Sequence, residues 1–229
     1  MIPGFWLDGS TWSAVTPPLE QAGHRVRALT LPGKESKDAD RSGISLKDHV
    51  AFVVAAVDEA EGPVVLVGHS GGGAIAQLAA DARPDRIARV VYVDSAPAPE
   101  GSVVNDAIPV VNDELPLPEW GFFEDEDLVD LDDEMRAAFR ERAIPEPVGP
   151  AYDRSSFTSE RRLEVPSTII CCEFPSKLIA EWIEAGAPFV REVANMRHVE
   201  YLDLPTGHWP QFTKPIELGG VLLDVVERT

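Results

Sequence analysis

The sequence predicts a single α/β domain whose core is a doubly wound, mostly parallel sheet. Three observations predict this fold class. The chain of 229 residues has the size of one domain. Short apolar segments rich in β-branched residues alternate with segments of helical period along most of the chain. One stretch near the middle departs from this alternation, which indicates an insertion within the domain.

Five segments are the predicted strands, because each is a short apolar run bounded by turn residues. In chain order they are Arg25–Leu29, Val64–Val67, Val90–Val93, Ser167–Cys172 and Val199–Leu204. Four predicted helices lie before, between and after them, at Trp12–Ala22, His49–Ala60, Gly72–Ala82 and Ile216–Arg228. This order is typical of parallel strands joined by helices that pack on both faces of a sheet.

Residues 97–162 are the predicted lid, inserted in the single domain 1–229. Between Asp94 and Arg162, proline becomes frequent and aromatic side chains cluster. The run Glu124–Glu134 within this stretch is strongly acidic. We interpret it as the solvated face of a helix rather than a cation site, because leucines recur within it at helical spacing.

The charge balance excludes some classes of partner. The chain has 20 Lys and Arg against 39 Asp and Glu, a formal net charge of -19, so nucleic acid and anionic membranes are poor partners. The start, Met1 to Asp8, lacks the basic and apolar regions of a signal peptide, and no window approaches the ~20 apolar residues of a membrane span. We therefore expect a cytoplasmic monomer or homodimer that acts on a small molecule.

A possible nucleophile follows the second predicted strand. The chain there reads Gly68-His69-Ser70-Gly71-Gly72 and continues into an alanine-rich helix. A serine at a tight strand-to-helix bend needs residues without bulk two positions before and after it, and Gly68 and Gly72 meet that need. The helix start would also place the Gly71 N–H and the helix dipole where they stabilise a developing oxyanion. The pattern favours Ser70 as a nucleophile.

The same glycines allow a second interpretation. Gly71 to Ala76 also matches the G-x-G-x-x-A pattern of a dinucleotide-binding turn, with Asp94 near the distance of a ribose-binding acid. Such fingerprints commonly stand in the first βαβ unit, whereas this one follows an earlier β/α segment. His208 also has no part in that alternative.

His208 is the predicted base. It lies between Gly207 and Pro210, after the last predicted strand and before the final helix. An imidazole titrates near neutral pH, so it can take a proton from a serine hydroxyl and return it to a leaving group. The chain order of serine followed by histidine also fits such a site.

These residues give the chain a family resemblance. The residues that carry it are Pro3-Gly4-Phe5-Trp6, Trp12, Gly23 to Val26, Leu29 to Gly33, Val65 to Gly73, Pro84 to Ile87 and Gly207-His208. They resemble the α/β-hydrolase superfamily, in which the bend that corresponds to Gly68–Gly72 is called the nucleophile elbow. Within it, the chain resembles the esterase and hydroxynitrile-lyase group that also contains plant methylesterases. The resemblance covers nearly the whole chain outside the lid.

The resemblance implies a second oxyanion donor. The Phe5 backbone N–H would serve beside that of Gly71, because Pro3-Gly4-Phe5 stands where the family has His-Gly-x. Proline at position 3 departs from the family histidine, but a backbone donor does not depend on that side chain. The chain also begins almost inside the strand expected before this loop, so we expect a short strand or a true start upstream of Met1.

The third member of the site departs from the family pattern. Many members carry Asp after the strand that corresponds to Ser167–Cys172, where this chain has Glu173, which stands close to the strand end. Asp94 resembles the alternative position that some haloalkane dehalogenases use. Both loops open at the same end of a parallel sheet, so either carboxylate can reach His208. We take Asp94 as the acid and Glu173 as the second candidate.

The predicted activity is that of a carboxylesterase-like serine hydrolase without cofactor or metal, acting on a small, largely apolar ester or lactone. The residues expected to line an apolar pocket are Trp6, Trp120, Phe122, Phe123 and Trp209. Three alternatives stay open: a hydroxynitrile-lyase type of C–C lyase, a non-catalytic binding protein, and the dinucleotide-dependent oxidoreductase. The lyase needs a basic group in the pocket, for which Lys177 is the candidate.

Overall fold

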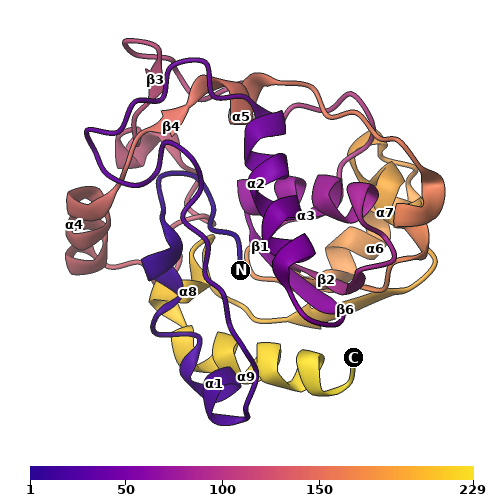
Figure 1. Cartoon of the computed structure of the whole chain (residues 1–229). Coiled ribbons are helices and arrows are strands. Elements are labelled where there is room, and N and C mark those ends of the chain that lie inside the picture. Colours follow the sequence, from indigo (N-terminus) through magenta and orange to yellow (C-terminus); the bar gives the residue numbers. More distant parts are fainter.

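The computed structural model describes residues 1–229 and contains a four-stranded sheet at its centre (Figure 1). All strand pairs of this sheet are parallel, in the order β1-β2-β5-β6. The strands are β1 (Val64–His69), β2 (Ile87–Val93), β5 (Ser167–Cys171) and β6 (Val199–Asp203). The predicted fold class is therefore confirmed, and four of the five predicted strands are present.

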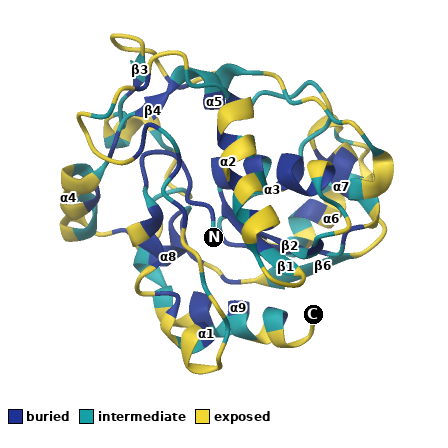
Figure 2. Cartoon of the chain, viewed as in Figure 1, coloured by how far each residue is buried: buried dark blue, intermediate teal, exposed yellow.

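Helices cover both faces of the sheet (Figure 1). On one face lie α2 (Leu46–Glu59), α3 (Gly71–Ala82), α6 (Ser176–Glu184) and α7 (Arg191–Asn195). On the other lie α1 (Pro17–Gln21) and α9 (Pro215–Glu227). Successive strand residues point to opposite faces, so Leu66 joins the core under α3 while Val67 joins the core under α9. Buried residues accordingly concentrate where helices meet strands (Figure 2).

The segment Arg25–Leu29 is not a strand, contrary to the prediction. Its neighbour in the sheet is only the beginning of the chain: the Met1 ammonium donates to Arg27 O at 2.6 Å, and Leu29 N–H donates to Met1 O at 2.9 Å. Ile2 in turn forms a single parallel bridge with Gly68 of β1. Two hydrogen bonds do not make a ladder, so this segment does not join the sheet.

The predicted helix Trp12–Ala22 is also interrupted. A 3₁₀ turn covers Gly9–Trp12, and α1 begins only at Pro17. Proline cannot donate a backbone hydrogen bond and restricts the residue before it, so the pair Pro17-Pro18 fits only the first turn of a helix. The other three predicted helices occur within a few residues of their expected bounds.

The stretch between β2 and β5 packs as a third layer at one end of the sheet (Figure 1). It contains β3 (Glu114–Leu115), α4 (Asp133–Arg142), β4 (Glu146–Pro147) and α5 (Val148–Tyr152), with β3 and β4 paired antiparallel. The short helix α8 (Pro210–Thr213) follows β6. A separate apolar cluster holds the layer against the start of the chain; its buried members are Phe5, Trp6, Leu7, Ile108, Leu115, Leu131, Phe139, Ala151 and Trp209.

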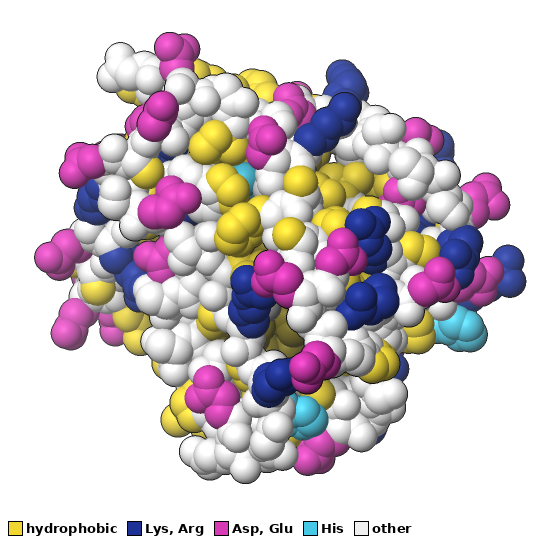
Figure 3. All heavy atoms as spheres, in the orientation of Figure 1, with side chains coloured by type: hydrophobic (Ala, Val, Ile, Leu, Met, Phe, Trp, Pro, Cys, Tyr) yellow, Lys and Arg dark blue, Asp and Glu magenta, His cyan; other side chains and the backbone are white.

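The acidic run Glu124–Glu134 is not the face of one helix, contrary to our interpretation. Turns cover most of it, and α4 begins only at Asp133, because the side chain of Asp132 accepts the Met135 N–H and caps the helix there. On the face shown in Figure 3, acidic side chains are spread widely with Lys and Arg side chains among them.

None of the helices combines the length and apolarity that crossing a membrane requires.

Candidate active site

Ser70 lies between β1 and α3 in a strained backbone conformation, with φ of 51° and ψ of -126°. The bend brings neighbouring chain so close that side chains are excluded on both sides. A Cβ on Gly68 would lie 2.7 Å from the Gly72 carbonyl carbon, and a Cβ on Gly72 would lie 2.6 Å from the carbonyl oxygens of Ile2 and Pro3. Strain of this kind concentrates at functional sites, because the surrounding structure must hold it.

His208 comes from the loop between β6 and α8 and reaches the serine. Its Nε2 lies 2.8 Å from Ser70 Oγ, across 138 positions of the sequence. Two hydrogen bonds fix the backbone of His208. Its N–H donates to Asp127 O at 2.8 Å, and the His69 ring donates to His208 O at 2.6 Å. The serine and the histidine are thus held in hydrogen-bonding position by separate elements.

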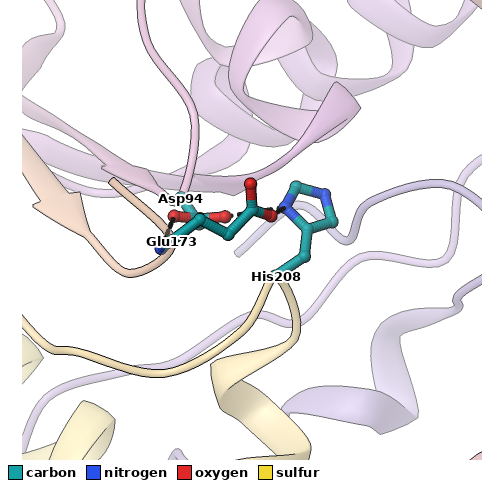
Figure 4. A group of neighbouring side chains, drawn as sticks. All are labelled: Asp94, Glu173 and His208. Atoms are coloured by element: carbon teal, nitrogen blue, oxygen red, sulfur yellow. Dashed lines mark hydrogen bonds and ion pairs between the residues drawn. The ribbon is translucent and has the colours of Figure 1, made fainter. Parts of the chain in front are cut away.

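Both candidate acids converge on the other ring nitrogen of His208, as Figure 4 shows. Asp94 Oδ2 accepts from Nδ1 at 2.7 Å, and Asp94 Oδ1 accepts the N–H groups of Cys172 and Glu173 at 2.9 and 3.1 Å. Glu173 Oε1 lies 2.6 Å from the same nitrogen but makes no aligned hydrogen bond. Both carboxylates therefore reach the imidazole from the same end of the sheet, although Glu173 stands close to the end of β5.

The three groups titrate as a unit. Burial lowers the pKa of His208, but its contacts with Asp94 and Glu173 outweigh burial and raise that pKa to about 10. Burial tends to raise the pKa of Asp94, and the hydrogen bond from His208 holds it below its ordinary value. Burial raises the pKa of Glu173 to about 8, and the contact with His208, which lowers this pKa, only partly offsets the effect of burial. The arrangement keeps Asp94 ionised and favours a proton on Glu173 at neutral pH.

The same three residues have the donor types of a metal site, with ligand atoms within 4.8 Å of one another. The separations of 2.6 and 2.7 Å around Nδ1 are those of shared protons. Ligand atoms that each lie about 2.0–2.2 Å from a tetrahedral zinc stand farther apart than that. The geometry therefore suits proton transfer better than metal binding.

Two backbone donors near Ser70 have no partner. Gly71 is the first residue of α3, and its N–H has no intrahelical acceptor. The Phe5 N–H makes no hydrogen bond in the structure, and the Phe5 ring lies directly over Gly71, within 2.7 Å of a Cβ built there. These are the two N–H groups that the family resemblance implies as oxyanion donors.

A cavity of about 360 Å³ opens at Ser70. Of its 23 lining residues, 12 are hydrophobic and none is Lys or Arg, so it suits an uncharged, mainly apolar ligand. Of the predicted pocket residues, Trp6, Phe122 and Phe123 line it. Lining residues that sequence analysis missed come mainly from the loop after β2 and from α3; they include Gln77, Leu78, Ser95, Ala98, Ser102, Asn105 and Ile108.

Trp120 and Trp209 do not line the cavity, contrary to the prediction. Trp209 is 1% exposed, and its ring contacts those of Trp120, Phe123 and Phe139 at centroid distances of 5.2 to 6.1 Å. These indoles fill the third core cluster behind the cavity wall. A cluster of aromatic residues in a sequence does not distinguish a pocket lining from the packing layer beneath it.

Two of the alternatives lose their structural basis. Lys177, the basic candidate for a lyase, has a side chain that is 87% exposed and does not line the cavity. Asp94, which a dinucleotide site would direct to a ribose, instead accepts the hydrogen bond from His208. Ser70 and His208 are both present and in contact, which a protein that only binds a ligand does not require.

The fold and the serine–histidine–carboxylate arrangement are those of the α/β-hydrolase class. The chain belongs to the alpha/beta hydrolase family, whose model matches residues 1–218. Methylesterase 7 of Arabidopsis thaliana is similar over 256 aligned residues at 27% identity, covering 100% of this chain and 95% of the plant protein. The resemblance inferred from the sequence is confirmed.

Other relatives match over shorter stretches. A pyrethroid hydrolase of Sphingobium wenxiniae is 35% identical over 94 residues, which cover 41% of this chain and only 34% of that enzyme.

Among solved structures, an extracellular α/β-hydrolase from a Paenibacillus species aligns with a TM-score of 0.76 and 19% identity, over 97% of this chain and 96% of its own. A methylesterase from Arabidopsis aligns with a TM-score of 0.75 and 18% identity, over 100% and 98%. These structural likenesses show the shared fold.

Proposed function

We propose that the protein is a serine esterase that hydrolyses a small, neutral, largely apolar carboxylic ester or lactone. The observation that carries the proposal is the unbroken line from Ser70 Oγ to His208 Nε2 and from His208 Nδ1 to Asp94 Oδ2, at 2.8 and 2.7 Å. A serine hydroxyl is a weak nucleophile unless a base accepts its proton, and an imidazole held by a carboxylate is such a base.

In the first step, Ser70 Oγ attacks the ester carbonyl while its proton moves to His208 Nε2. Asp94 stabilises the imidazolium that forms and holds the ring in the tautomer with hydrogen on Nδ1. The N–H groups of Phe5 and Gly71, free of other partners, stabilise the negative charge that develops on the carbonyl oxygen. His208 then gives its proton to the alcohol, which leaves, and an ester of Ser70 remains.

In the second step, His208 takes a proton from water, which attacks the acyl group on Ser70. The same two N–H groups stabilise the second oxyanion. Return of the proton from His208 to Ser70 Oγ releases the carboxylic acid and restores the starting state. The atoms balance with water alone, so the sequence of steps requires no metal and no organic cofactor.

The cavity and the relatives support the substrate class. A volume of about 360 Å³ lies at the small end of the roughly 300–1,000 Å³ of ligand pockets in general. Phe5, Trp6, Phe122 and Phe123 give it aromatic walls. Similar proteins carry the names methylesterase, pyrethroid hydrolase and carbendazim hydrolyzing esterase. We propose that the cavity receives an ester with an aromatic or alicyclic group.

Covalent labelling tests the proposed function. A fluorophosphonate probe should label the purified protein on Ser70, and labelling should disappear in Ser70→Ala while the circular dichroism spectrum stays unchanged. The protein should also hydrolyse short-chain nitrophenyl esters at a rate that Ser70→Ala abolishes. A folded wild type that neither takes up the probe nor hydrolyses the esters would refute the proposal.

A further inference from the structure

A buried ion pair lies outside the proposed catalytic groups and close to the oxyanion loop. The side chains of Lys34 and Glu146 are only 1% and 3% exposed and contact each other directly. Lys34 Nζ also donates to Ile144 O at 2.8 Å. Removing two charges from water costs more than such a pair reliably returns, so a buried salt bridge is weak grounds for stability. The other contacts of the pair therefore indicate what role it has.

Glu146 also holds the backbone of Trp6. Its Oε2 accepts the Trp6 N–H at 3.0 Å, and the neighbouring Ile144 N–H donates to Trp6 O at 2.9 Å. The Trp6 indole donates to Leu115 O at 3.1 Å, and Leu115 pairs with Glu146 between β3 and β4. The backbone donor, the backbone acceptor and the side chain of Trp6 are thus all fixed by the layer between β2 and β5.

Trp6 needs this support because of its conformation. The residues Gly4 to Leu7 form a β-turn closed by a hydrogen bond from Leu7 N–H to Gly4 O at 3.3 Å. Trp6, at the third position of this turn, has φ of 64°. Positive φ at that position is typical of type II turns and normally requires glycine, so a bulky residue is strained there. Without external contacts the turn would relax to another conformation.

The same turn presents the Phe5 N–H. Phe5 is the second residue of the turn, and its N–H is the free donor near Ser70. That N–H belongs to the residue directly before Trp6. Loss of the contact that holds the Trp6 N–H would free the peptide between Phe5 and Trp6 to flip, and this would loosen the short loop that positions the Phe5 N–H. An oxyanion donor is effective only when it is aimed in advance at the position where charge develops.

We propose that Glu146 is a positioning residue for the oxyanion loop. Its carboxylate holds Trp6 in the strained turn that directs the Phe5 N–H toward the reacting carbonyl, and Lys34 fixes the carboxylate. This inference rests on the proposed esterase function. It assigns to a side chain 140 positions from Trp6 an effect on the chemical step without contact with the substrate.

Paired double variants test the inference without leaving a buried charge unpaired. In Lys34→Met/Glu146→Gln, the amide oxygen can still accept the Trp6 N–H, whereas in Lys34→Met/Glu146→Leu it cannot. We expect the Gln variant to keep kcat within a few-fold of wild type. In the Leu variant, kcat should fall by up to about 10²-fold while KM changes little. Thermal unfolding of both variants shows whether they fold equally well.

A trifluoromethyl ketone and the matching methyl ketone separate positioning from folding. The first forms an anionic adduct with the serine and needs the oxyanion donors, whereas the second binds chiefly through ground-state contacts. The ratio of their inhibition constants should change at least about tenfold in the Leu variant and little in the Gln variant. Removal of the remote buried pair, in Arg162→Met/Glu192→Leu, should lower the unfolding temperature without changing the ratio.

The outcomes distinguish the two proposals. A wild type that lacks esterase activity and fluorophosphonate labelling would refute the proposed function itself. An active wild type, with folded Leu and Gln variants that match in kcat and in inhibitor ratio, would overturn the role of Glu146 alone. If the Leu variant does not fold, Glu146→Asp keeps the charge but draws it back from Trp6, and a normal inhibitor ratio in that variant would overturn the inference equally.

Discussion

Asp94 and Glu173 approach the same nitrogen of His208, at 2.7 and 2.6 Å, yet only Asp94 is fixed by backbone donors. One carboxylate is thus prepared to remain charged, while burial raises the pKa of the other despite its contact with His208. Replacing each separately distinguishes an essential acid from a group that adjusts the basicity of the imidazole.

Replacing Asp94 should abolish most of the activity. Asp94→Asn keeps the shape but removes the charge that stabilises the imidazolium and fixes its tautomer, so kcat should fall by about 10⁴-fold. Glu173→Gln should change kcat only a few-fold. Steady-state kinetics on a nitrophenyl ester measures both, with unfolding curves as the control for folding. The opposite ranking would assign the role of the acid to Glu173.

The pH dependence should reveal the second carboxylate. The proposed mechanism requires a neutral His208, whose pKa is raised to about 10, so kcat/KM should increase as pH rises toward that value. Glu173 helps to raise the pKa of His208 by stabilising the imidazolium. Glu173→Gln should therefore lower the pKa of His208 and move the acid limb of the profile to lower pH. An unmoved limb would show that Glu173 carries no charge while His208 titrates.

A negative charge on the substrate should lower the rate of hydrolysis. Glu124 and Asp127 line the cavity together with Asp94, and no Lys or Arg does. A nitrophenyl ester with a terminal carboxylate should therefore have a kcat/KM at least about tenfold below that of its neutral isostere, which corresponds to about 1.4 kcal/mol. The difference should shrink in high salt, because Glu124 is exposed and screened. Equal rates at low salt would contradict the prediction.

His69, the residue before Ser70, should stabilise the fold rather than take part in catalysis. Burial and the neighbouring His208 lower the pKa of His69 to about 3, so it is neutral near physiological pH and donates from Nε2 to His208 O. His69→Leu leaves that buried carbonyl without its partner and should reduce the free energy of unfolding by about 1–3 kcal/mol. Urea unfolding measures this cost. A wild-type midpoint in the variant would mean that another donor, such as a water molecule, replaces the ring.

The sequence was most informative where local pattern and chemistry coincide. The glycine-flanked Ser70 and the loop residue His208 are recognisable because the elbow demands particular residue types at fixed spacing. Asp94 and Glu173 were both identified, but only three-dimensional structure could show that they share one nitrogen. The segment Arg25–Leu29 was wrongly predicted because a strand also needs a neighbour of matching length, which its own residues do not encode.

Other features depend on contacts between distant segments. The pair Lys34 and Glu146 is separated by 112 positions, and neither residue stands in a recognisable motif. Trp209 follows His208 directly and was expected in the pocket, yet its ring turns into the core. Side-chain direction in a loop is set by tertiary packing, so no periodic pattern predicts it.

The layer between β2 and β5 is attached to the proposed catalytic centre at two places. Asp127 O accepts the backbone N–H of His208, and Glu146 accepts that of Trp6. An engineer who exchanges this stretch for that of a relative to alter selectivity would therefore transplant the supports of the base and the oxyanion loop as well as the pocket wall. Chimeras that keep residues 127–129 and 144–146 native should retain turnover, whereas wholesale grafts should fold into hydrolases with impaired chemistry.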